Sequence, residues 1–441
     1  MRLALTLAAS LALAGCATVP PPAAPSSVEA SRLSARADTL FEQRARDHDL
    51  SGALLVRHDG QTVLRRTYGY ADWEAERPHD AATRYSAASI TKGLTAAAVV
   101  KLSRAGQLDL AAPVARYVPA LAGLPPFTVT QVLAHEAGLP RDLPDDWAGG
   151  TVSAWLASYP DTVGPLGEEH YSNVGYAVLA EVVAAASGRA FTDYIATEIL
   201  RPAGMTDSAL VEGTAADVAN GSKGYSPGPA PLDVMPAIEA PLEPGASGLV
   251  ATADDLALWV EGLAKGAYPE FFVPDDPLGS VDRKTGAIGE YISVQGSLPG
   301  YFANAIAWNG GRDSVVFAGN LFAAPALSMR DDLLALVGDT ALAATPPRPA
   351  EIAPTAAHTA LLGRWRTDDF GDVLIARSGK DGSYRLSMIG KPAYWSFHLT
   401  PIAGGFHWRA FGRIVERQGD AVTMRALPDG KAKVMQPLLA D

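Results

Sequence analysis

The pattern of hydrophobic and polar positions changes along the chain. From about residue 35 to 343, runs with helical spacing predominate. The expected helices are Lys92–Ala105, Tyr176–Ala186, Ala251–Leu263 and Ser328–Leu336. Ser51–Val56 and Thr62–Tyr68 flank the turn dipeptide Asp59-Gly60, which predicts a β-hairpin at the start of this part.

The C-terminal part has a period of two instead. Tyr384, Leu386 and Met388 alternate with polar residues, and Gly and Asp punctuate the turns between similar stretches. We therefore expect residues 358–441 to form a small antiparallel β domain. A Pro- and Ala-rich stretch at 344–357 predicts the linker in front of it.

The N-terminus shows a third pattern, an apolar run from Leu3 to Ala14 that ends at Cys16. The run is too short to span a bilayer, which needs about 20 residues, and with Leu13-Ala14-Gly15-Cys16 it resembles a bacterial lipoprotein signal. We expect removal of residues 1–15, lipidation of Cys16, and a Pro-rich linker over 16–34. The expected location is the bacterial envelope, facing the periplasm, with outer-membrane sorting.

Composition agrees with a folded, exported protein. Hydrophobic residues make up 48% and charged residues 19% of the chain. A formal net charge of −12 argues against a nucleic-acid partner. Cys16 is the only cysteine, so the chain can form no intrachain disulfide, and a cysteine nucleophile is implausible.

Candidate chemistry begins with Ser89-Ile90-Thr91-Lys92, at the start of the first expected helix. Ser89 and Lys92 stand one helical turn apart, so a deprotonated Lys92 can reach the hydroxyl proton of Ser89. The helix N-terminus also favours a developing anion. The alternative is that Ser89 is an ordinary helix N-cap.

Tyr171-Ser172-Asn173 supplies the second candidate group. Tyr171 would act as general base or acid if Lys92 lowers its pKa from about 10. Asn173 follows two residues later, which puts both side chains on the same side of an extended segment. The alternative for this string is a surface turn.

These strings, with Val132–Leu139, Gly248–Leu256 and a glycine turn at Gly296–Tyr301, resemble the class C β-lactamase, penicillin-binding and esterase superfamily of serine hydrolases, over about residues 35 to 340. The resemblance implies an α+β fold, with an antiparallel sheet flanked by helices and a mostly helical insert that carries Tyr171. It also implies an acyl-enzyme on Ser89, and a role for Asn173 in binding the substrate carbonyl or amide and steadying Lys92.

The third family motif, Lys-Thr-Gly or His-x-Gly, departs from the pattern. A literal Lys284-Thr285-Gly286 is present, but counting back from Gly300-Tyr301 and Asn320 puts Val294 at the basic position and Gly296 at the glycine. We therefore interpret Lys284 as a decoy in a loop ahead of the strand. In this register the resemblance implies an oxyanion hole from the backbone N–H groups of Ser89 and Ser297.

Val294 cannot anchor a substrate carboxylate, so the sequence does not favour true β-lactamase activity. We expect an esterase or D-amino-acid peptidase that acts on a small-molecule or peptide-like ester or amide, with Asn173, Val294 and Gly296 lining the substrate site. The alternative is a non-catalytic envelope protein that keeps the fold and binds peptidoglycan or a partner.

Other polar residues are weaker candidates for a functional site. His135 is more typical of a structural histidine than of a catalytic one, because it belongs to no defensible triad. Glu168, Glu169 and His170 lack a second His or Cys at ligand spacing, which favours a solvated loop. The sequence therefore predicts neither a metal nor a cofactor.

Overall fold

The computed structural model describes residues 27–438, except 145, 146, 148, 230–233, 238–242, 273–280, 380 and 381. The expected signal peptide and Cys16 lie outside the described residues. The last part of the expected linker is helical instead, because α1 spans Ser27–Arg46. Glu29 in its first turn and Arg44 and Arg46 in its last turn complement the helix dipole.

The larger part of the protein is built on a six-stranded antiparallel sheet with strand order β10-β11-β12-β13-β1-β2. Its strands are β1 (Gly52–His58), β2 (Gln61–Tyr68), β10 (Val281–Gly286), β11 (Gly289–Leu298), β12 (Tyr301–Trp308) and β13 (Asp313–Gly319). The first hairpin pairs β1 with β2, and β13 pairs along the other edge of β1 from Gly52↔Gly319 onward. The two sequence ends of this part therefore meet in one sheet.

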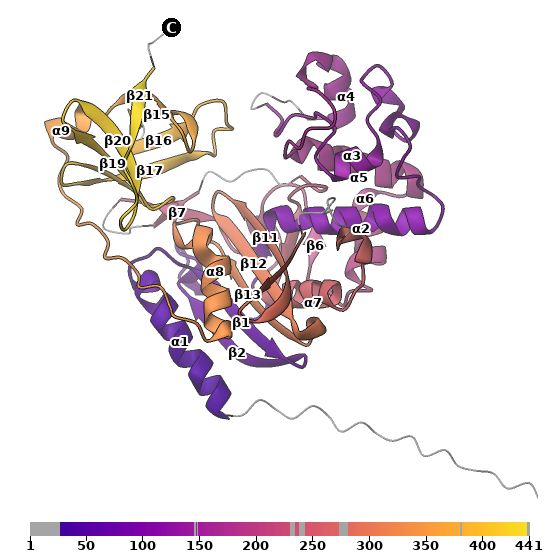
Figure 1. The fold of residues 1–441 in the computed structure, drawn as a ribbon, viewed down its shortest axis with the longest axis horizontal. Helices are drawn as coiled ribbons and strands as arrows, with labels where there is room; N and C mark the ends of the chain where they lie inside the picture. The colour runs from indigo at the N-terminus through magenta and orange to yellow at the C-terminus, as the bar shows by residue number, and fades with distance from the viewer. Residues whose placement is uncertain are drawn as a thin grey trace, which may run out of the picture.

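Helices cover both faces of the sheet (Figure 1). Leu54 and Val56 pack with α1 and α8 (Pro325–Gly338). Ala53 and Leu55 belong to the core shared with α2 (Thr91–Arg104), α5 (Asn173–Ser187) and α7 (Ala253–Ala264). Because both faces of β1 are buried, its sequence reads as a continuous apolar run rather than as an alternation.

The helical insert lies between the sheet strands in sequence and beside the sheet in space (Figure 1). The remaining helices are α2 (Thr91–Arg104), α3 (Val129–Leu133), α4 (Val152–Ser158), α5 (Asn173–Ser187), α6 (Phe191–Ile195), α7 (Ala253–Ala264) and α9 (Ala356–Thr359). All four expected helices are confirmed, as α2, α5, α7 and α8. Within the described ranges no single helix is long and apolar enough to cross a membrane; α5 and the helical stretch 191–200 meet that test only together, across a 78° bend.

Short strand pairs connect the insert to the sheet. They are β3 (Tyr70–Asp72) with β4 (Arg77–Pro78), β5 (Tyr85–Ser86) and β6 (Ala209–Leu210) on either side of β9 (Leu249–Ala251), and β7 (Tyr225–Pro227) with β8 (Val234–Pro236). β9 lies next to the start of α2, where Ala87 N–H donates to Leu249 O at 2.8 Å.

The C-terminal part is a closed antiparallel β-barrel, which confirms the expected β domain and the α+β class. Its strands are β14 (Gly363–Thr367), β15 (Gly371–Arg377), β16 (Tyr384–Met388), β17 (Ser396–Ile402), β18 (Gly405–Trp408), β19 (Arg413–Gln418), β20 (Ala421–Ala426) and β21 (Lys433–Pro437). The alternating residues Tyr384 and Leu386 face the barrel core together with Phe406 and Trp408.

The barrel is docked by apolar and ionic contacts on the part built around the six-stranded sheet. Phe322, which follows β13, packs into the barrel core with its ring 5.9 Å from that of Phe397. Arg409 is 1% exposed, and its guanidinium contacts Asp49 Oδ1 at 2.7 Å and the carbonyl of His48 at 3.0 Å. A buried guanidinium that is paired in this way fixes one orientation of the barrel.

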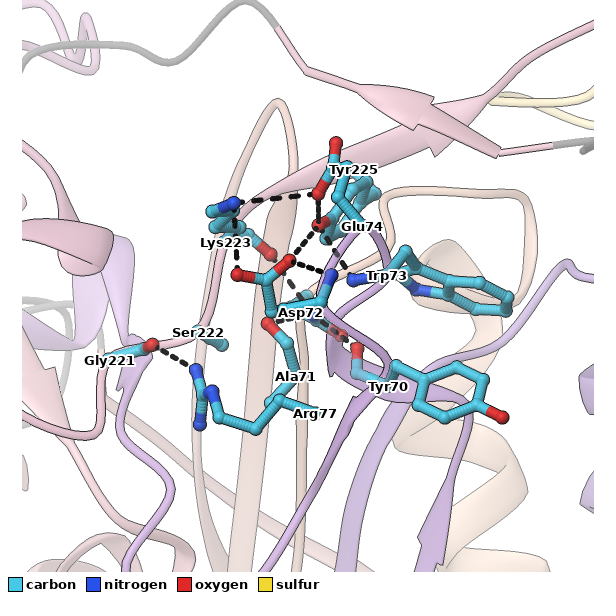
Figure 2. Close-up of polar contacts among 12 residues, drawn as sticks. Tyr70, Ala71, Asp72, Trp73, Glu74, Arg77, Gly221, Ser222, Lys223 and Tyr225 are labelled. Atoms are coloured by element: carbon cyan, nitrogen blue, oxygen red, sulfur yellow. Dashed lines mark hydrogen bonds and ion pairs between the residues drawn. The ribbon is translucent and has the colours of Figure 1, made fainter.

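A polar network joins residues 70–77, which contain β3 and β4, to residues 221–225 at the start of β7 (Figure 2). Lys223 Nζ pairs with Asp72 Oδ2 at 2.9 Å, and Tyr225 OH accepts from Trp73 N–H at 2.8 Å and donates to Glu74. Burial is the largest single influence on Asp72 and would raise its pKa, but the hydrogen bonds from Lys223 and Ala75 N–H, together with the hydrogen bond to Glu74 and the charge of Lys223, lower that pKa overall. β7 is thereby fixed where it contacts β17 of the barrel.

Candidate active site

Ser89 lies in a 3-10 turn, Ala88–Ile90, directly before α2. Ala88 has a φ of 47°, in the left-handed region that residues with a Cβ rarely adopt, and strain of this kind clusters at functional sites. The N-cap position of α2 is Ile90, so Ser89 does not cap the helix. Its Oγ lies 2.7 Å from Tyr171 OH instead, and the N-cap alternative is wrong.

Lys92 is 0% exposed, and its Nζ contacts three oxygen atoms. The distances are 3.2 Å to Ser89 Oγ, 2.7 Å to Asn173 Oδ1 and 3.0 Å to Ala246 O. Burial lowers the pKa of Lys92 below its ordinary 10.5, although Tyr171 opposes this. A neutral amine can donate its two N–H groups to the amide and carbonyl oxygens and turn its lone pair to Ser89.

Two threonines of α2 position the segment that supplies the Ala246 carbonyl. Thr91 Oγ1 accepts from Leu249 N–H at 2.9 Å, and Thr95 Oγ1 donates to Gly245 O at 2.7 Å. These contacts explain why the motif at Gly248–Leu256 accompanies the nucleophile motif in the sequence.

Tyr171 and Asn173 enter the site from the start of α5. Ser172 caps that helix by accepting from Gly175 N–H at 2.8 Å, and its backbone is extended. The side chains on either side of it therefore point the same way, to Ser89 and Lys92, as the spacing predicted. The surface-turn alternative for this string is wrong.

Asp142 is a residue that sequence reasoning missed. Its Oδ1 accepts from Asn173 Nδ2 at 2.6 Å, and its Oδ2 lies 3.6 Å from Nζ of Lys391, in the barrel turn between β16 and β17. The barrel thus reaches the polar network that supports Lys92. No motif or spacing relates residues 142, 173 and 391, so only the fold brings them together.

Gly296 brings β11 against the turn Ala88–Ile90 that carries the candidate nucleophile Ser89, hereafter the nucleophile turn. A Cβ at this position would lie 2.3 Å from Ala87 O and 2.7 Å from Ser89 N, closer than packed atoms allow. The glycine is therefore required by the close approach of two backbones. β11 continues to the exposed Ser297 beside this contact, which is the strand placement that the expected oxyanion hole needs.

Val294 and Lys284, the two candidates for the basic position, do not lie in the surroundings that the sequence predicted. Val294 is 2% exposed and belongs to the core cluster with Ala87 and Ile90, so its side chain packs rather than lining a substrate site. Lys284 lies in strand β10 and not in a loop, because the β10–β11 hairpin turns only after Gly286. It pairs with Asp282 at 3.2 Å at the edge of the sheet.

The histidines have contacts of different kinds. His135 Nδ1 accepts from Ser172 N–H at 3.1 Å, and its ring centre lies 4.6 Å from that of Tyr171. Burial, helped by Lys92, lowers the pKa of His135 to about 4, so the ring is neutral. His170 is exposed and pairs with Glu168 at 3.3 Å; in the described part of the chain no group of three His, Cys, Asp or Glu residues is arranged for a metal ion.

Known proteins resemble this chain in sequence and fold. Esterase EstB of Burkholderia gladioli is 30% identical over 306 residues, 63% of this chain and 75% of the esterase. Penicillin-binding protein 4* of Bacillus subtilis (strain 168) is 31% identical over 188 residues; the match spans 38% of this chain and 40% of that relative. A crystal structure of SurE superposes with a TM-score of 0.59 at 23% identity and covers 93% of this chain and 100% of that one.

The structural likeness extends over the barrel, since it covers nearly the whole chain. A family model described as Beta-lactamase matches residues 37–286, more than half of the 441 residues, and this match contains the nucleophile turn, the Tyr171 segment and α7. The chain therefore belongs to the β-lactamase family of serine hydrolases.

Proposed function

We propose that the protein is a serine hydrolase that cleaves an ester or a D-amino-acid amide through an acyl-enzyme on Ser89. The observation that carries the proposal is the contact of Ser89 Oγ with both Lys92 Nζ, at 3.2 Å, and Tyr171 OH, at 2.7 Å. A nucleophile is thereby flanked by a buried amine with a lowered pKa and by a phenol that can carry a proton.

In the first half-reaction Ser89 Oγ bonds to the substrate carbonyl carbon and gives its proton to neutral Lys92. Tyr171 OH protonates the leaving oxygen or nitrogen as its bond to that carbon breaks, and Lys92 returns a proton to Tyr171. Water then attacks the acyl carbon and gives a proton to the same pair. The bond between that carbon and Ser89 Oγ breaks, the acid leaves, and the pair returns the proton to Ser89 Oγ. The backbone N–H groups of Ser89 and Ser297 would stabilise the oxyanion, each worth about 2.7–4 kcal/mol.

An ester or amide without a carboxylate anchor fits this site better than a penicillin does. Val294 is buried and apolar where relatives of the family are expected to carry a cation, and Lys284 is engaged at the sheet edge. A relative named as an esterase supports the same choice.

Intact mass spectrometry tests the proposal. The protein is exposed separately to a fluorophosphonate and to a penicillin, with Ser89→Ala as the control. We expect one phosphonyl adduct that is absent from the variant, and no stable penicilloyl adduct. No adduct from either probe would contradict the proposal and favour a non-catalytic envelope protein that binds peptidoglycan or a partner.

We also propose that Cys16 carries a lipid anchor that holds the protein at the bacterial envelope, facing the periplasm at the outer membrane. The apolar run before Cys16 and the Pro-rich stretch after it support this proposal. Incorporation of labelled palmitate in cells, with Cys16→Ser as the control, tests it; equal labelling of the two proteins would contradict it.

A further inference from the structure

A cavity of about 830 Å³ lies next to the groups that contact Lys92, because Asp142 and Gly245 are among its lining residues. This volume lies within the range of roughly 300–1,000 Å³ that small-ligand sites occupy. The insert, α5 and the segment before β9 form most of its wall, and Pro392–Tyr394 of the barrel turn complete it. Trp147, Phe191 and Tyr394 give it aromatic surface.

The cavity shares its wall with the groups that hold Lys92. Asp142 lines it and binds Asn173 Nδ2 at 2.6 Å. Glu243 and Gly245 also line it, and the next residue, Ala246, accepts the hydrogen bond from Lys92. The cavity therefore shares residues with the groups that position Lys92, and Lys92 Nζ in turn contacts Ser89 Oγ at 3.2 Å.

The charges on the wall are of one sign. Four carboxylates line the cavity, from Asp142, Glu181, Glu212 and Glu243, and no lysine or arginine is among its described lining residues. Two of the four already have partners, because Asp142 pairs with Lys391 and Glu181 Oε1 accepts from Ser153 N–H at 3.0 Å.

Glu243 differs from the other carboxylates. Its Oε2 is buried and has no hydrogen-bond partner among the residues that the structure describes. A buried carboxylate oxygen without a donor is costly, and native proteins rarely keep one without a reason. A donor on a ligand in the cavity would satisfy it.

We propose that this cavity is the acyl-side subsite of the enzyme and takes an acyl chain that ends in a protonated amine, held by Glu243 and covered by Tyr394 of the barrel. The inference rests on the proposed function, because it assigns one substrate class to the same site. The aromatic wall suits the aliphatic part of such a chain, and the barrel becomes part of the substrate site.

The ionisation of Glu243 gives the proposal a pH signature. Burial raises the pKa of this carboxyl to about 7; Lys92 opposes the rise, and Asp142 adds to it. Glu181 and Glu212 share the cavity wall with it. Above pH 7 the carboxylate attracts an ammonium group more strongly than the neutral acid does below pH 7, while an alkyl amine stays protonated across this range.

The test compares two p-nitrophenyl esters of equal length, the 6-aminohexanoate and the heptanoate. We expect kcat/KM to favour the amino ester by about 10-fold at pH 8, as a charge-assisted contact allows. The ratio should fall toward one in Glu243→Gln and stay unchanged in Glu29→Gln, on α1. Because the ratio compares substrates on one enzyme, it does not depend on how much of the variant is folded.

The outcomes with the two esters separate the subsite from the proposed function. Hydrolysis of both esters at equal kcat/KM, or a ratio that does not rise between pH 6 and 8, would overturn the subsite and leave the hydrolase. Hydrolysis of neither ester above the Ser89→Ala level would overturn both. Tyr394→Ala should raise KM for both esters, and an unchanged KM would remove the barrel from the subsite.

Discussion

The side-chain amide of Asn173 is held in one orientation by Asp142. Asn173 Nδ2 donates to Asp142 Oδ1 at 2.6 Å. The other end of the amide, Asn173 Oδ1, therefore faces Lys92 Nζ, at 2.7 Å. A rotated amide would turn its own N–H groups toward the amine and leave the carboxylate facing an oxygen. Asp142 is thus a positioning residue that acts on the lysine through Asn173.

We expect Asp142→Leu to lower kcat for p-nitrophenyl acetate by about 5- to 100-fold, because an unsatisfied amide donor costs ~1–3 kcal/mol and frees the amide to rotate. Asp142→Asn keeps an acceptor oxygen and should lose less. Steady-state kinetics on both variants measure the difference. Equal kcat values for Asp142→Leu and the unchanged protein would show that the amide needs no such support.

Gly296→Ala should disturb the nucleophile turn directly. The added Cβ would lie 2.3 Å from Ala87 O, and both atoms belong to backbone or are fixed to it, so one segment must move. We expect kcat to fall by about 100-fold, which corresponds to the loss of one oxyanion-hole donor.

The matched control for this variant is Gly262→Ala on α7, where a Cβ would meet nothing within 4 Å. This control should keep full activity and gain about 0.5–1 kcal/mol of stability, because alanine is the better helix former. Thermal unfolding and ester hydrolysis of both variants provide the comparison. Full activity in Gly296→Ala would mean that β11 does not form part of the site.

The sequence was sufficient for the parts of the site that are local or fixed by periodicity. Ser89 and Lys92 meet because they stand one helical turn apart, and Tyr171 and Asn173 point together because an extended cap residue separates them. The expected helices and the barrel strands followed from runs with clear spacing. In each case the contact depends on neighbours in the chain.

What could not be predicted depends on contacts between distant segments. The pairing of Asp142 with Lys391 joins residues of two domains, and residues 392–394 of the barrel turn complete the wall of the cavity beside it. Counting back from Gly300-Tyr301 and Asn320 puts Lys284 ahead of the strand, but it does not show that a further strand, β10, pairs there; the two-residue turn after Gly286 has no strong turn signal. The burial of Val294 likewise follows from the packing of the sheet against α2.

The buried Lys92 should set the acid side of the pH profile. Burial lowers its pKa from 10.5, so the neutral amine is present at pH values below those of an exposed lysine, and kcat/KM for a neutral ester should rise with pH to a midpoint below 10.5. Lys92→Arg places a guanidinium there that stays protonated and cannot accept the serine proton. A midpoint at or above 10.5, or an unchanged profile in that variant, would contradict a role as base.

His135 should make the fold sensitive to acid independently of catalysis. Its pKa in the folded protein is about 4, below the ordinary 6.5, so the unfolded chain binds a proton in this interval and the folded chain does not. The contribution of His135 to the free energy of unfolding is therefore complete above pH 6.5. As the pH falls to about 4, protonation of His135 in the unfolded chain lowers the free energy of unfolding by up to about 3 kcal/mol.

His135→Asn isolates this effect. The asparagine oxygen can accept from Ser172 N–H as Nδ1 does, and asparagine tolerates the φ of 63° at this position. Urea unfolding between pH 4 and 7 should show a shallower loss of stability in the variant, while His79 and His407, whose pKa values burial also lowers, titrate in both proteins. If the two proteins lose stability in parallel, His135 is already protonated in the folded state, and its ring cannot be the neutral acceptor that holds Ser172 beside Tyr171.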